Sequence, residues 1–304
     1  MTGQLTGQLA ALGAAALWAC TALAIEGAVR RIGSLTVNLI RLVFAFGFLC
    51  LGGWLFRGQP LPVDATPHAW IWLTISGLVG FTFGDLCLYR AFAVLGSRLS
   101  TLMMSLVPPL AALIGWLALG ETLVPRDLLG MTLTVGGIAW AVLERTKPAA
   151  SEGRASGHGG HVSLAGIALG FGGALGQAGG LILSKIGMGS YHAMAATQIR
   201  VIAGFAGYAL LFFVLGWWPN VRKGMTDRKA LGLTALGAFF GPFAAVTLSL
   251  IAIRATLAGV AASIMALTPV LIIPLVILLR GERVGIGGLA GAVVAVCGVA
   301  LLFL

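Results

Sequence analysis

Residues 104–121 read MSLVPPLAALIGWLALGE, and residues 265–282 read MALTPVLIIPLVILLRGE. Each stretch begins with methionine, has a proline at its fifth position and ends in Gly-Glu. Chance matches are common between apolar segments rich in Gly and Ala, but a proline and a Gly-Glu pair at the same spacing are harder to obtain by chance. The sequence therefore predicts an internal duplication, and a repeat of this size determines the architecture of a chain.

The duplication extends beyond these two stretches. At the same offset of 161 residues, the match runs without a gap to the end of the chain and also pairs Gly80 with Gly241, Leu106 with Leu267, Gly130 with Gly291 and Gly137 with Gly298. Nearer the N-terminus, an offset of 159 residues pairs Gly13 with Gly172, Ile40 with Ile199, Arg41 with Arg200 and Phe46 with Phe205. The two offsets fit one old duplication with a short insertion.

The composition places most of this chain in a lipid bilayer. Hydrophobic residues make up 59% of its 304 residues, charged residues only 9%, and the mean hydropathy is +1.02. Soluble domains carry about 25% charged residues, so a water-soluble enzyme is excluded. A membrane-crossing helix needs about 20 apolar residues, and ten such runs are present: 5–26, 34–56, 70–89, 99–119, 125–143, 163–184, 192–216, 230–251, 257–279 and 284–304. They lack the alternation of a membrane β-barrel.

The sequence thus predicts an all-α integral membrane protein with ten transmembrane helices in two five-helix halves. The halves are residues 1–143 and 163–304, and a flexible linker rich in Gly and Ser joins them over residues 144–162. Since five is an odd number, the second half enters the membrane from the opposite side, which makes an inverted-topology repeat. Such folds bind substrate near the midplane between the repeats and alternate access by rocking one half against the other.

The net charge of +10 indicates orientation rather than a nucleic-acid partner. Thirteen Lys and Arg residues fall in the odd-numbered loops and four in the even-numbered loops. Because cytoplasmic loops carry the excess of positive charge, the count favours odd loops in the cytoplasm and both termini outside. The basic residues form no patch or tail that would bind a nucleic acid.

The chain resembles the ten-helix EamA-type members of the drug/metabolite transporter superfamily. The resemblance rests on the repeated proline and Gly-Glu spacing, on Arg41 and Arg200, and on Gly130 and Gly291. The overall sequence looks most like the aromatic amino-acid exporter branch. That likeness implies a monomer in the cytoplasmic membrane, in contact with lipid, that exports small molecules such as amino acids, including aromatic ones. Members of this superfamily often have their termini inside, which leaves the orientation open.

Other functions remain as alternatives. The chain could export other metabolites or drugs, such as purines or sugar derivatives, or it could be a channel or scaffold. No phosphate-binding loop of the Gly-x-x-x-x-Gly-Lys-Ser/Thr type is present, which argues against direct use of ATP. The spans contain no His in their interiors and no Gly-x-Ser-x-Gly motif. We therefore expect a protein that is not an enzyme and that needs no cofactor or metal.

Asp85 is the one acidic residue clearly inside a predicted span. Ionisable groups are costly within a membrane, so each is a functional candidate. Thr82, three residues earlier, and Tyr89, four residues later, share a helix face with Asp85. We interpret the three as a cavity-lining set that binds a substrate ammonium group or passes a proton. The alternative is a structural pair with Arg90 or Arg98 near the membrane surface.

Arg41 and Arg200 occupy equivalent places early in the second and seventh spans. Asn38 precedes Arg41 by one turn, and Gln198 precedes Arg200. A guanidinium would suit a substrate carboxylate, but the duplicated placement favours a shared structural task, such as bonding helix-end carbonyls or reaching towards the surface. Asn38 is a candidate for substrate binding.

Pro108 and Pro269 lie ten residues into their spans. A proline within a helix removes one backbone hydrogen bond and exposes a carbonyl about one turn earlier. We expect a hinge at each proline, with Ser105 and Ser263 lining the cavity nearby. The alternative is a pair of kinks that only improve helix packing.

Three further polar or amphipathic residues are candidates for the cavity wall. Trp18 and its repeat equivalent Gln177 lie in the middle of their spans, and Thr21 is one turn from Trp18. Tryptophan usually lies at membrane interfaces, so a mid-span Trp suits an organic substrate, although simple packing against lipid or protein is an equal alternative.

The remaining charged residues at span ends have expected structural roles. We expect Glu121, and its counterpart Glu282, to cap the following helix or to meet a nearby arginine such as Arg126. Glu26 and Lys185 close their spans at equivalent positions and are expected to anchor the helices at the membrane surface.

Overall fold

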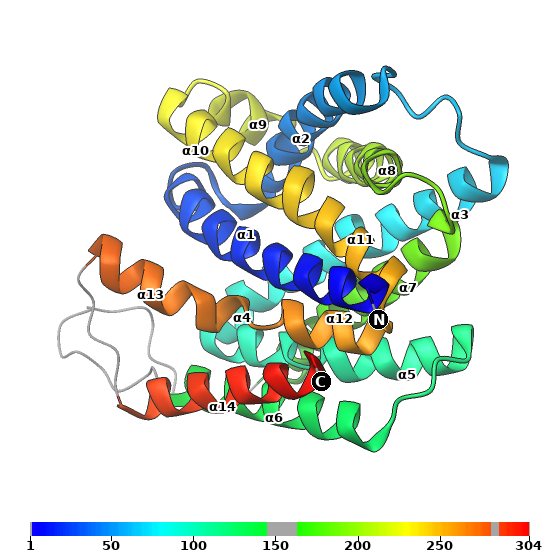
Figure 1. Cartoon of the computed structure of the whole chain (residues 1–304). Helices are drawn as coiled ribbons and strands as arrows, with labels where there is room; N and C mark the ends of the chain where they lie inside the picture. Colours follow the sequence, from blue (N-terminus) through cyan, green and yellow to red (C-terminus); the bar gives the residue numbers. More distant parts are fainter. Residues whose placement is uncertain (1, 145–162, 281–285, 304) are drawn as a thin grey trace, which may run out of the picture.

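The computed structural model describes residues 2–144, 163–280 and 286–303, and these residues form helices and no strands (Figure 1). The first half contains α1 (Thr2–Ile32), α2 (Ser34–Arg57), α3 (Pro67–Gly77), η1 (Leu78–Gly84), α4 (Asp85–Met104), α5 (Val107–Leu119) and α6 (Pro125–Glu144). The second half contains α7 (Leu164–Met188), α8 (Ala193–Val214), α9 (Trp218–Gly224), α10 (Arg228–Ala238), η2 (Phe239–Ala245), α11 (Val246–Ala255), α12 (Ala258–Met265), α13 (Thr268–Arg280) and α14 (Ile286–Phe303).

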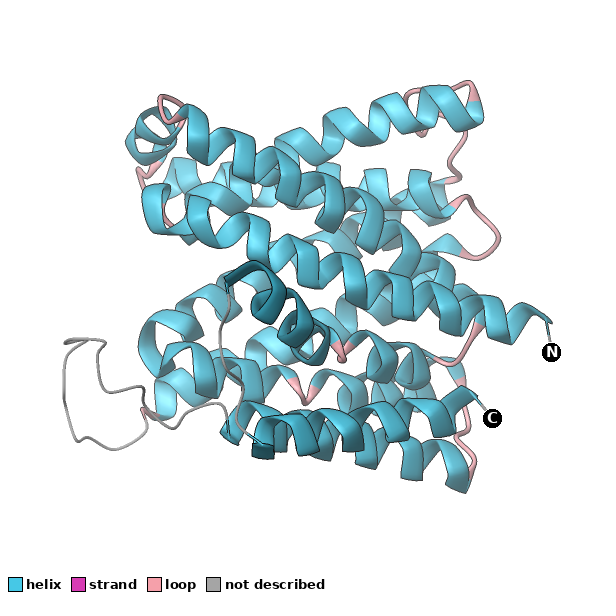
Figure 2. Ribbon diagram, turned by 60° about the vertical axis from the view of Figure 1, so that its left-hand side comes forward, coloured by secondary structure: helices cyan, strands magenta, loops and turns pink. Residues whose placement is uncertain are grey.

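Local sequence signals account for several helix ends. The side chain of Thr66 caps the N-terminus of α3 by accepting a hydrogen bond from Ala69 N. Asp227 begins α10 in the same way. The helices α2 and α5 end at glycines in the left-handed conformation, Gly58 and Gly120, because glycine adopts it without strain. Figure 2 shows the loops that join the helices.

Nine helical stretches of the described chain are long and apolar enough to cross a membrane. They are Gly3–Ile32, Ser34–Arg57, Pro67–Gly96, Leu99–Leu119, Pro125–Leu143, Leu164–Met188, Ala193–Val214, Arg228–Ala255 and Ala258–Leu275. The tenth predicted span, 284–304, corresponds to α14, whose apolar part Gly287–Phe303 is shorter. The predicted order of spans is therefore observed, while ten full-length spans are not reached within the described residues.

The two halves repeat a similar succession of elements, although α9 has no counterpart in the first half and α11 and α12 together correspond to α4. A π-helix occupies residues 78–84 in the first half and residues 239–245 in the second, which is the predicted offset of 161. The helices α5 and α13 cover equivalent residues at the same offset. Both termini lie at one end of the helix bundle (Figure 1). The predicted linker after Glu144, and Gly281-Glu282, lie outside the described residues.

The helices α6 and α14 form the most nearly symmetric contact between the halves. Gly130 lies against Gly298, and Gly137 lies against Gly291. Since Gly130 corresponds to Gly291 and Gly137 to Gly298, exchanging the two halves exchanges these two contacts. Small residues at helix interfaces in membranes let the backbones approach closely, so this contact uses the duplicated glycines directly.

The two π-helices differ in their local features. Pro242 lies inside η2, where it cannot donate a backbone hydrogen bond. The helix η1 contains no proline and packs closely on α7, where Gly80 meets Gly180 and Gly84 meets Gly176. A Cβ atom on Gly176 would lie 2.6 Å from Gly84 Cα, so only glycine fits there. π-Helical turns are frequent at functional sites, and η1 ends directly before Asp85.

The two prolines that the sequence singled out, Pro108 and Pro269, lie at helix starts rather than within continuous helices. The chain leaves the helical path between α4 and α5, and again between α12 and α13. Pro108 and Pro269 each fall at the second residue of the helix that follows. In the first turn of a helix a proline costs no hydrogen bond, because that N–H has no partner within the helix. A hinge, as expected from the sequence, would therefore act at residues 105–106 and 266–267.

The two ends of the bundle are closed to different extents. At the end that carries the termini, α12 packs along α5, with Gly259 against Ala112. The counterparts of these helices at the opposite end are residues 97–104 of α4 and helix α13. No comparable packing joins these counterparts within the described residues, and Leu278 of α13 is 81% exposed. The terminus end is thus the more tightly closed.

Candidate functional site

A buried polar cluster surrounds Asp85 in the interior of the bundle. Asp85 is 7% exposed, and its Oδ2 atom lies 3.1 Å from Arg41 Nη2 in an ion pair. Asn38 donates a hydrogen bond of 3.3 Å to the same oxygen, and Gln177 donates one of 2.8 Å to Oδ1. Arg41 also donates to the side-chain oxygen of Asn38. Because Gln177 belongs to α7, the site joins the first half of the chain to the second.

The observed partner of Asp85 differs from both alternatives that its sequence neighbours offered. Arg90 lies over the ring of Trp217, with its Cζ atom 5.6 Å from the ring centroid, and the side chain of Arg98 lies outside the described residues. Arg41 is the partner instead. The sequence did contain a signal for this pair, which was missed: Arg41 and Asp85 carry opposite charges inside two different spans. Charges within a membrane usually pair with one another.

Arg200 is the second buried arginine of this region, and its contacts differ from those of Arg41. It is 5% exposed, lies over the Phe81 ring at 5.0 Å and lies beside Gly80 in η1. No hydrogen bond or ion pair links its guanidinium to another described residue, and its Nε atom, like that of Arg41, is buried without a partner. Asp85 lies within electrostatic range. The position in the second half that corresponds to Asp85 is Val246, so Arg200 lacks an acidic partner of its own.

Two tyrosines complete the cluster. Tyr89 and Tyr208 are both close enough to Arg41 for an electrostatic interaction. Tyr208 is fully buried, and its hydroxyl lies near Asn38 without a hydrogen bond of good geometry. We call the seven residues the central cluster: Asn38, Arg41, Asp85, Tyr89, Gln177, Arg200 and Tyr208. It holds two guanidinium groups and one carboxyl group.

The structure brings together only part of the candidate set. Asn38, Asp85 and Gln177 are joined by hydrogen bonds, and Tyr89 is nearby. Thr82 was expected on the same face as Asp85, but it donates a hydrogen bond of 3.4 Å to Gly204 O of α8. The wider turns of η1 change the phase of the helix, which explains why a spacing of three residues fails here.

The other candidates lie away from Asp85. Trp18 and Thr21 pack against Gly241 of η2. Ser263 donates to Gly259 O within its own helix, and Ser105 is buried without a hydrogen-bond partner. Sequence reasoning had left Arg41, Arg200 and Tyr208 out of the site.

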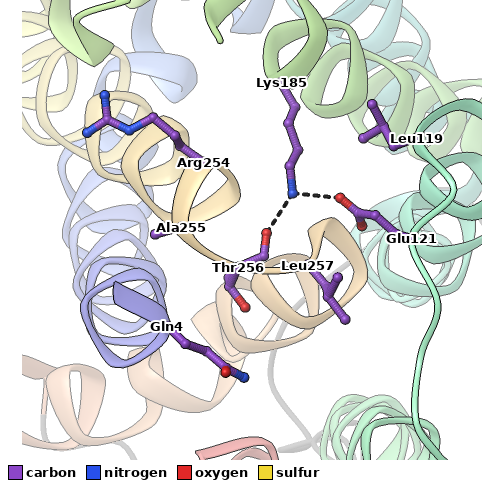
Figure 3. Close-up of a pocket in the computed structure, with 8 residues that line it drawn as sticks. All are labelled: Gln4, Leu119, Glu121, Lys185, Arg254, Ala255, Thr256 and Leu257. Atoms are coloured by element: carbon purple, nitrogen blue, oxygen red, sulfur yellow. Dashed lines mark hydrogen bonds and ion pairs between the residues drawn. The ribbon is translucent and has the colours of Figure 1, made fainter. Parts of the chain in front are cut away.

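A second polar site lies at the terminus end. An open pocket of about 590 Å³ is bordered by Gln4, Leu119, Glu121, Lys185, Arg254, Ala255, Thr256 and Leu257 (Figure 3). Lys185 Nζ lies 2.6 Å from Glu121 Oε1 and donates a hydrogen bond of 2.7 Å to Thr256 O. The other carboxylate oxygen of Glu121 accepts a hydrogen bond of 2.8 Å from Ala258 N. Glu121 therefore caps α12 of the second half, not the following helix or Arg126 as expected.

Lys185 is correspondingly more than a surface anchor, since it ties α7 to both Glu121 and the α11–α12 connection. Its repeat equivalent Glu26 instead forms an exposed pair of 2.8 Å with Arg30, one turn along α1. We call Glu121, Lys185 and the start of α12 the terminus-end latch.

A second group of charges joins two loops at the same end. Asp64 binds Arg57 at 2.7 Å and accepts a hydrogen bond of 2.8 Å from the Tyr191 hydroxyl. The hydrogen bond from Arg57 lowers the pKa of Asp64. Burial, followed by the hydrogen bond to Asp64, raises the pKa of Tyr191 to about 12. Partial burial, followed by the charges of Arg57 and Arg254, lowers the pKa of His192. These contacts connect the α2–α3 loop with the α7–α8 loop.

Comparison with known proteins identifies the family of this architecture. The profile described as the EamA-like transporter family matches residues 5–143 and 164–304. Among solved structures, one described only as the crystal structure of a protein has a TM-score of 0.74 and 19% sequence identity, and the match covers 97% of this chain and 95% of the other. At that identity the likeness concerns the fold alone. A search of curated proteins finds no match.

Proposed function

We propose, from the premise that the chain belongs to the EamA-like transporter family, that it is a secondary transporter for amino acids, including aromatic ones, and related small metabolites. In this proposal the protein acts as a monomer and exports its substrate across the cytoplasmic membrane. Its two halves alternate in exposing the central cluster to the two sides of the membrane.

The observation that carries the proposal is the hydrogen bond between Asp85 and Gln177. It joins the first half of the chain to the second at a buried place, and inverted repeats bind their substrates between the halves. Any rocking of one half against the other changes the surroundings of Asp85. A carboxylate has about four sites that can accept hydrogen bonds, and Asn38, Arg41 and Gln177 occupy three. One remains for a substrate ammonium group.

The terminus-end latch supports the proposal of alternating access. Glu121, Lys185 and Ala258 hold α12 against the first half, whereas the opposite end lacks the equivalent packing between α4 and α13 within the described residues. If both termini lie outside, as the Lys and Arg count favours, the less tightly packed end faces the cytoplasm. Substrate would then enter from the cytoplasm and leave after the latch opens.

Counterflow into liposomes tests this function. Purified protein is reconstituted into vesicles loaded with one unlabelled compound, and uptake of the same labelled compound is followed for amino acids, purines and sugar phosphates. We expect accumulation of labelled L-phenylalanine and related amino acids, which unlabelled amino acids compete away. Uptake of purines or sugar phosphates without uptake of amino acids would replace the proposed substrate class. A leak of labelled ions through the vesicle membrane that does not saturate with any compound would indicate a channel.

A further inference from the structure

We infer that Arg200 recognises the carboxylate of the substrate, while Asp85 recognises its ammonium group. This inference rests on the proposed transport of amino acids and makes it more specific. It assigns a binding role to a residue whose duplicated position had suggested a structural task.

The first support is the state of the guanidinium. A buried charge is costly unless it is paired and hydrogen-bonded. Arg200 is 5% exposed and has neither an ion pair nor a hydrogen bond among the described residues, apart from its contact with the Phe81 ring. A bound carboxylate would supply both the missing charge and two acceptor oxygens, which a guanidinium binds well.

The second support is a comparison that the duplication itself provides. Arg41 and Arg200 occupy equivalent positions, and both are buried. Arg41 is neutralised by Asp85, but the residue at the position equivalent to Asp85 in the second half is Val246. A shared structural task would call for similar partners in both halves. Because the second half has no acidic residue at this position, Arg200 keeps a positive charge that an anionic ligand can bind.

The third support is the position of Arg200 relative to Asp85. Its guanidinium lies beside Gly80, since a Cβ atom placed on Gly80 would be 3.2 Å from Nη2 of Arg200. Gly80 O accepts the backbone hydrogen bond of Asp85 N across one turn of η1. Arg200 therefore meets η1 at Gly80, one turn before Asp85, which directly follows η1. Gln177, which bonds Asp85 and also reaches Gly80 O at 3.4 Å, lies between them. This arrangement suits a zwitterion whose two charges are close together.

The test compares L-phenylalanine with L-phenylalaninamide, which keeps the ammonium group and lacks the carboxylate. In reconstituted wild-type protein we expect uptake of phenylalanine to exceed that of the amide by about tenfold or more, since a hydrogen bond to a charged group contributes about 1.5–3 kcal/mol. Arg200→Gln should abolish the preference by reducing phenylalanine uptake to the level of the amide. Arg200→Lys should retain part of the preference, because it keeps the charge without the paired donors.

Arg90→Gln is the matched control, since Arg90 is an exposed arginine that lies over Trp217 outside the central cluster. It should leave the uptake of both compounds unchanged. Equal uptake of phenylalanine and the amide by the wild type would overturn the role of Arg200 while leaving the proposed function intact. An equal loss of both compounds in Arg200→Gln would assign Arg200 a structural role. If the wild type transports neither compound, the proposed function fails and this inference fails with it. If Arg200→Gln does not fold, Arg200→Lys decides the matter, and a preference for phenylalanine equal to that of the wild type would then overturn the role of Arg200.

Discussion

Asp85 and Gln177 are 92 residues apart in the chain, and the amide of Gln177 donates a hydrogen bond of 2.8 Å to the Asp85 carboxylate. The two residues belong to different halves of the duplication. Gln177 is also the repeat equivalent of Trp18, which packs against Gly241 of η2. The equivalent of Asp85 is Val246, so the duplicated fold has diverged at two pairs of positions to form a single polar site rather than two.

The Asp85 carboxylate is expected to be required for transport. Asp85→Asn removes the charge that binds a substrate ammonium and neutralises Arg41, so uptake of L-phenylalanine should fall by about tenfold or more. The substitution also leaves Arg41 buried without a partner, a change that costs about 3–5 kcal/mol in soluble proteins. Uptake and thermal stability in detergent are measured together.

The double variant Arg41→Gln with Asp85→Asn separates the two effects. It should recover much of the stability, because it removes the charge of Arg41 together with that of its partner, and it should remain inactive. A pH series then tests proton transfer. If the uptake rates of Asp85→Asn match those of the wild type at every pH, Asp85 is neither a ligand nor a proton carrier.

The terminus-end latch is expected to control access from that side. Lys185→Met removes the pair with Glu121 and the hydrogen bond to Thr256 O, so the terminus end should open more often. The readout is the alkylation rate of Ala255→Cys, a position that borders the pocket, in a variant whose four native cysteines are replaced by serine. We expect an increase of about tenfold, the effect of losing one charged hydrogen bond.

Glu26→Gln is the control for this experiment, because Glu26 occupies the equivalent position in the first half and pairs with Arg30 on the surface. It should leave the alkylation rate at residue 255 unchanged. A latch role for Lys185 is refuted if both variants give the wild-type rate.

The sequence predicted the architecture well because apolar length and a repeat are properties of the chain alone. The order of the spans, the helical class and the offset of 161 residues between η1 and η2 were all accessible in this way. The partners of Asp85 were not, because they depend on which helix faces meet. The hydrogen bond of Thr82 to α8 was not predicted either, because no residue pattern indicated the π-helix that contains Thr82.

One site feature could have been found by comparing the halves residue by residue. Val246 at the position equivalent to Asp85 already shows that the two buried arginines have different partners. Glu121, in contrast, caps a helix of the other half. Only the assembled fold brings that helix start within reach, so no local capping rule could have predicted the contact.

The loop cluster around Asp64 and Tyr191 predicts a dependence of stability on pH. The pKa of His192 is lowered in the folded protein, so as the pH falls below its ordinary value of about 6.5, the unfolded chain binds a proton before the folded chain does. Stability should therefore decrease as the pH falls from 7.5 to 5. His192→Gln should make this decrease shallower in thermal unfolding measured across the series.

Asp64 and Tyr191 do not contribute in that pH window. Asp64 has a lowered pKa, so its stabilising charge is present above its ordinary value of about 3.9 and is lost only at more acidic pH. Tyr191, with a pKa of about 12, stays neutral throughout. An identical slope in the wild type and His192→Gln would exclude His192 as the source of the pH dependence.

The contact between α6 and α14 predicts that two adjacent glycines respond oppositely to the same substitution. A Cβ atom on Gly137 would overlap the backbone of α14 at Ala295, whereas one on Gly136 would meet nothing within 4 Å. Gly137→Ala should lower the free energy of unfolding by about 1–3 kcal/mol through overpacking. Gly136→Ala should be neutral or stabilising, because alanine favours a helix over glycine. Gly291→Ala, on the equivalent residue of the second half, should resemble Gly137→Ala, since its Cβ would lie 2.5 Å from Ala141 N. Thermal unfolding of the three variants in detergent measures this, and similar stabilities for Gly136→Ala and Gly137→Ala would mean that α6 and α14 do not touch through their backbones.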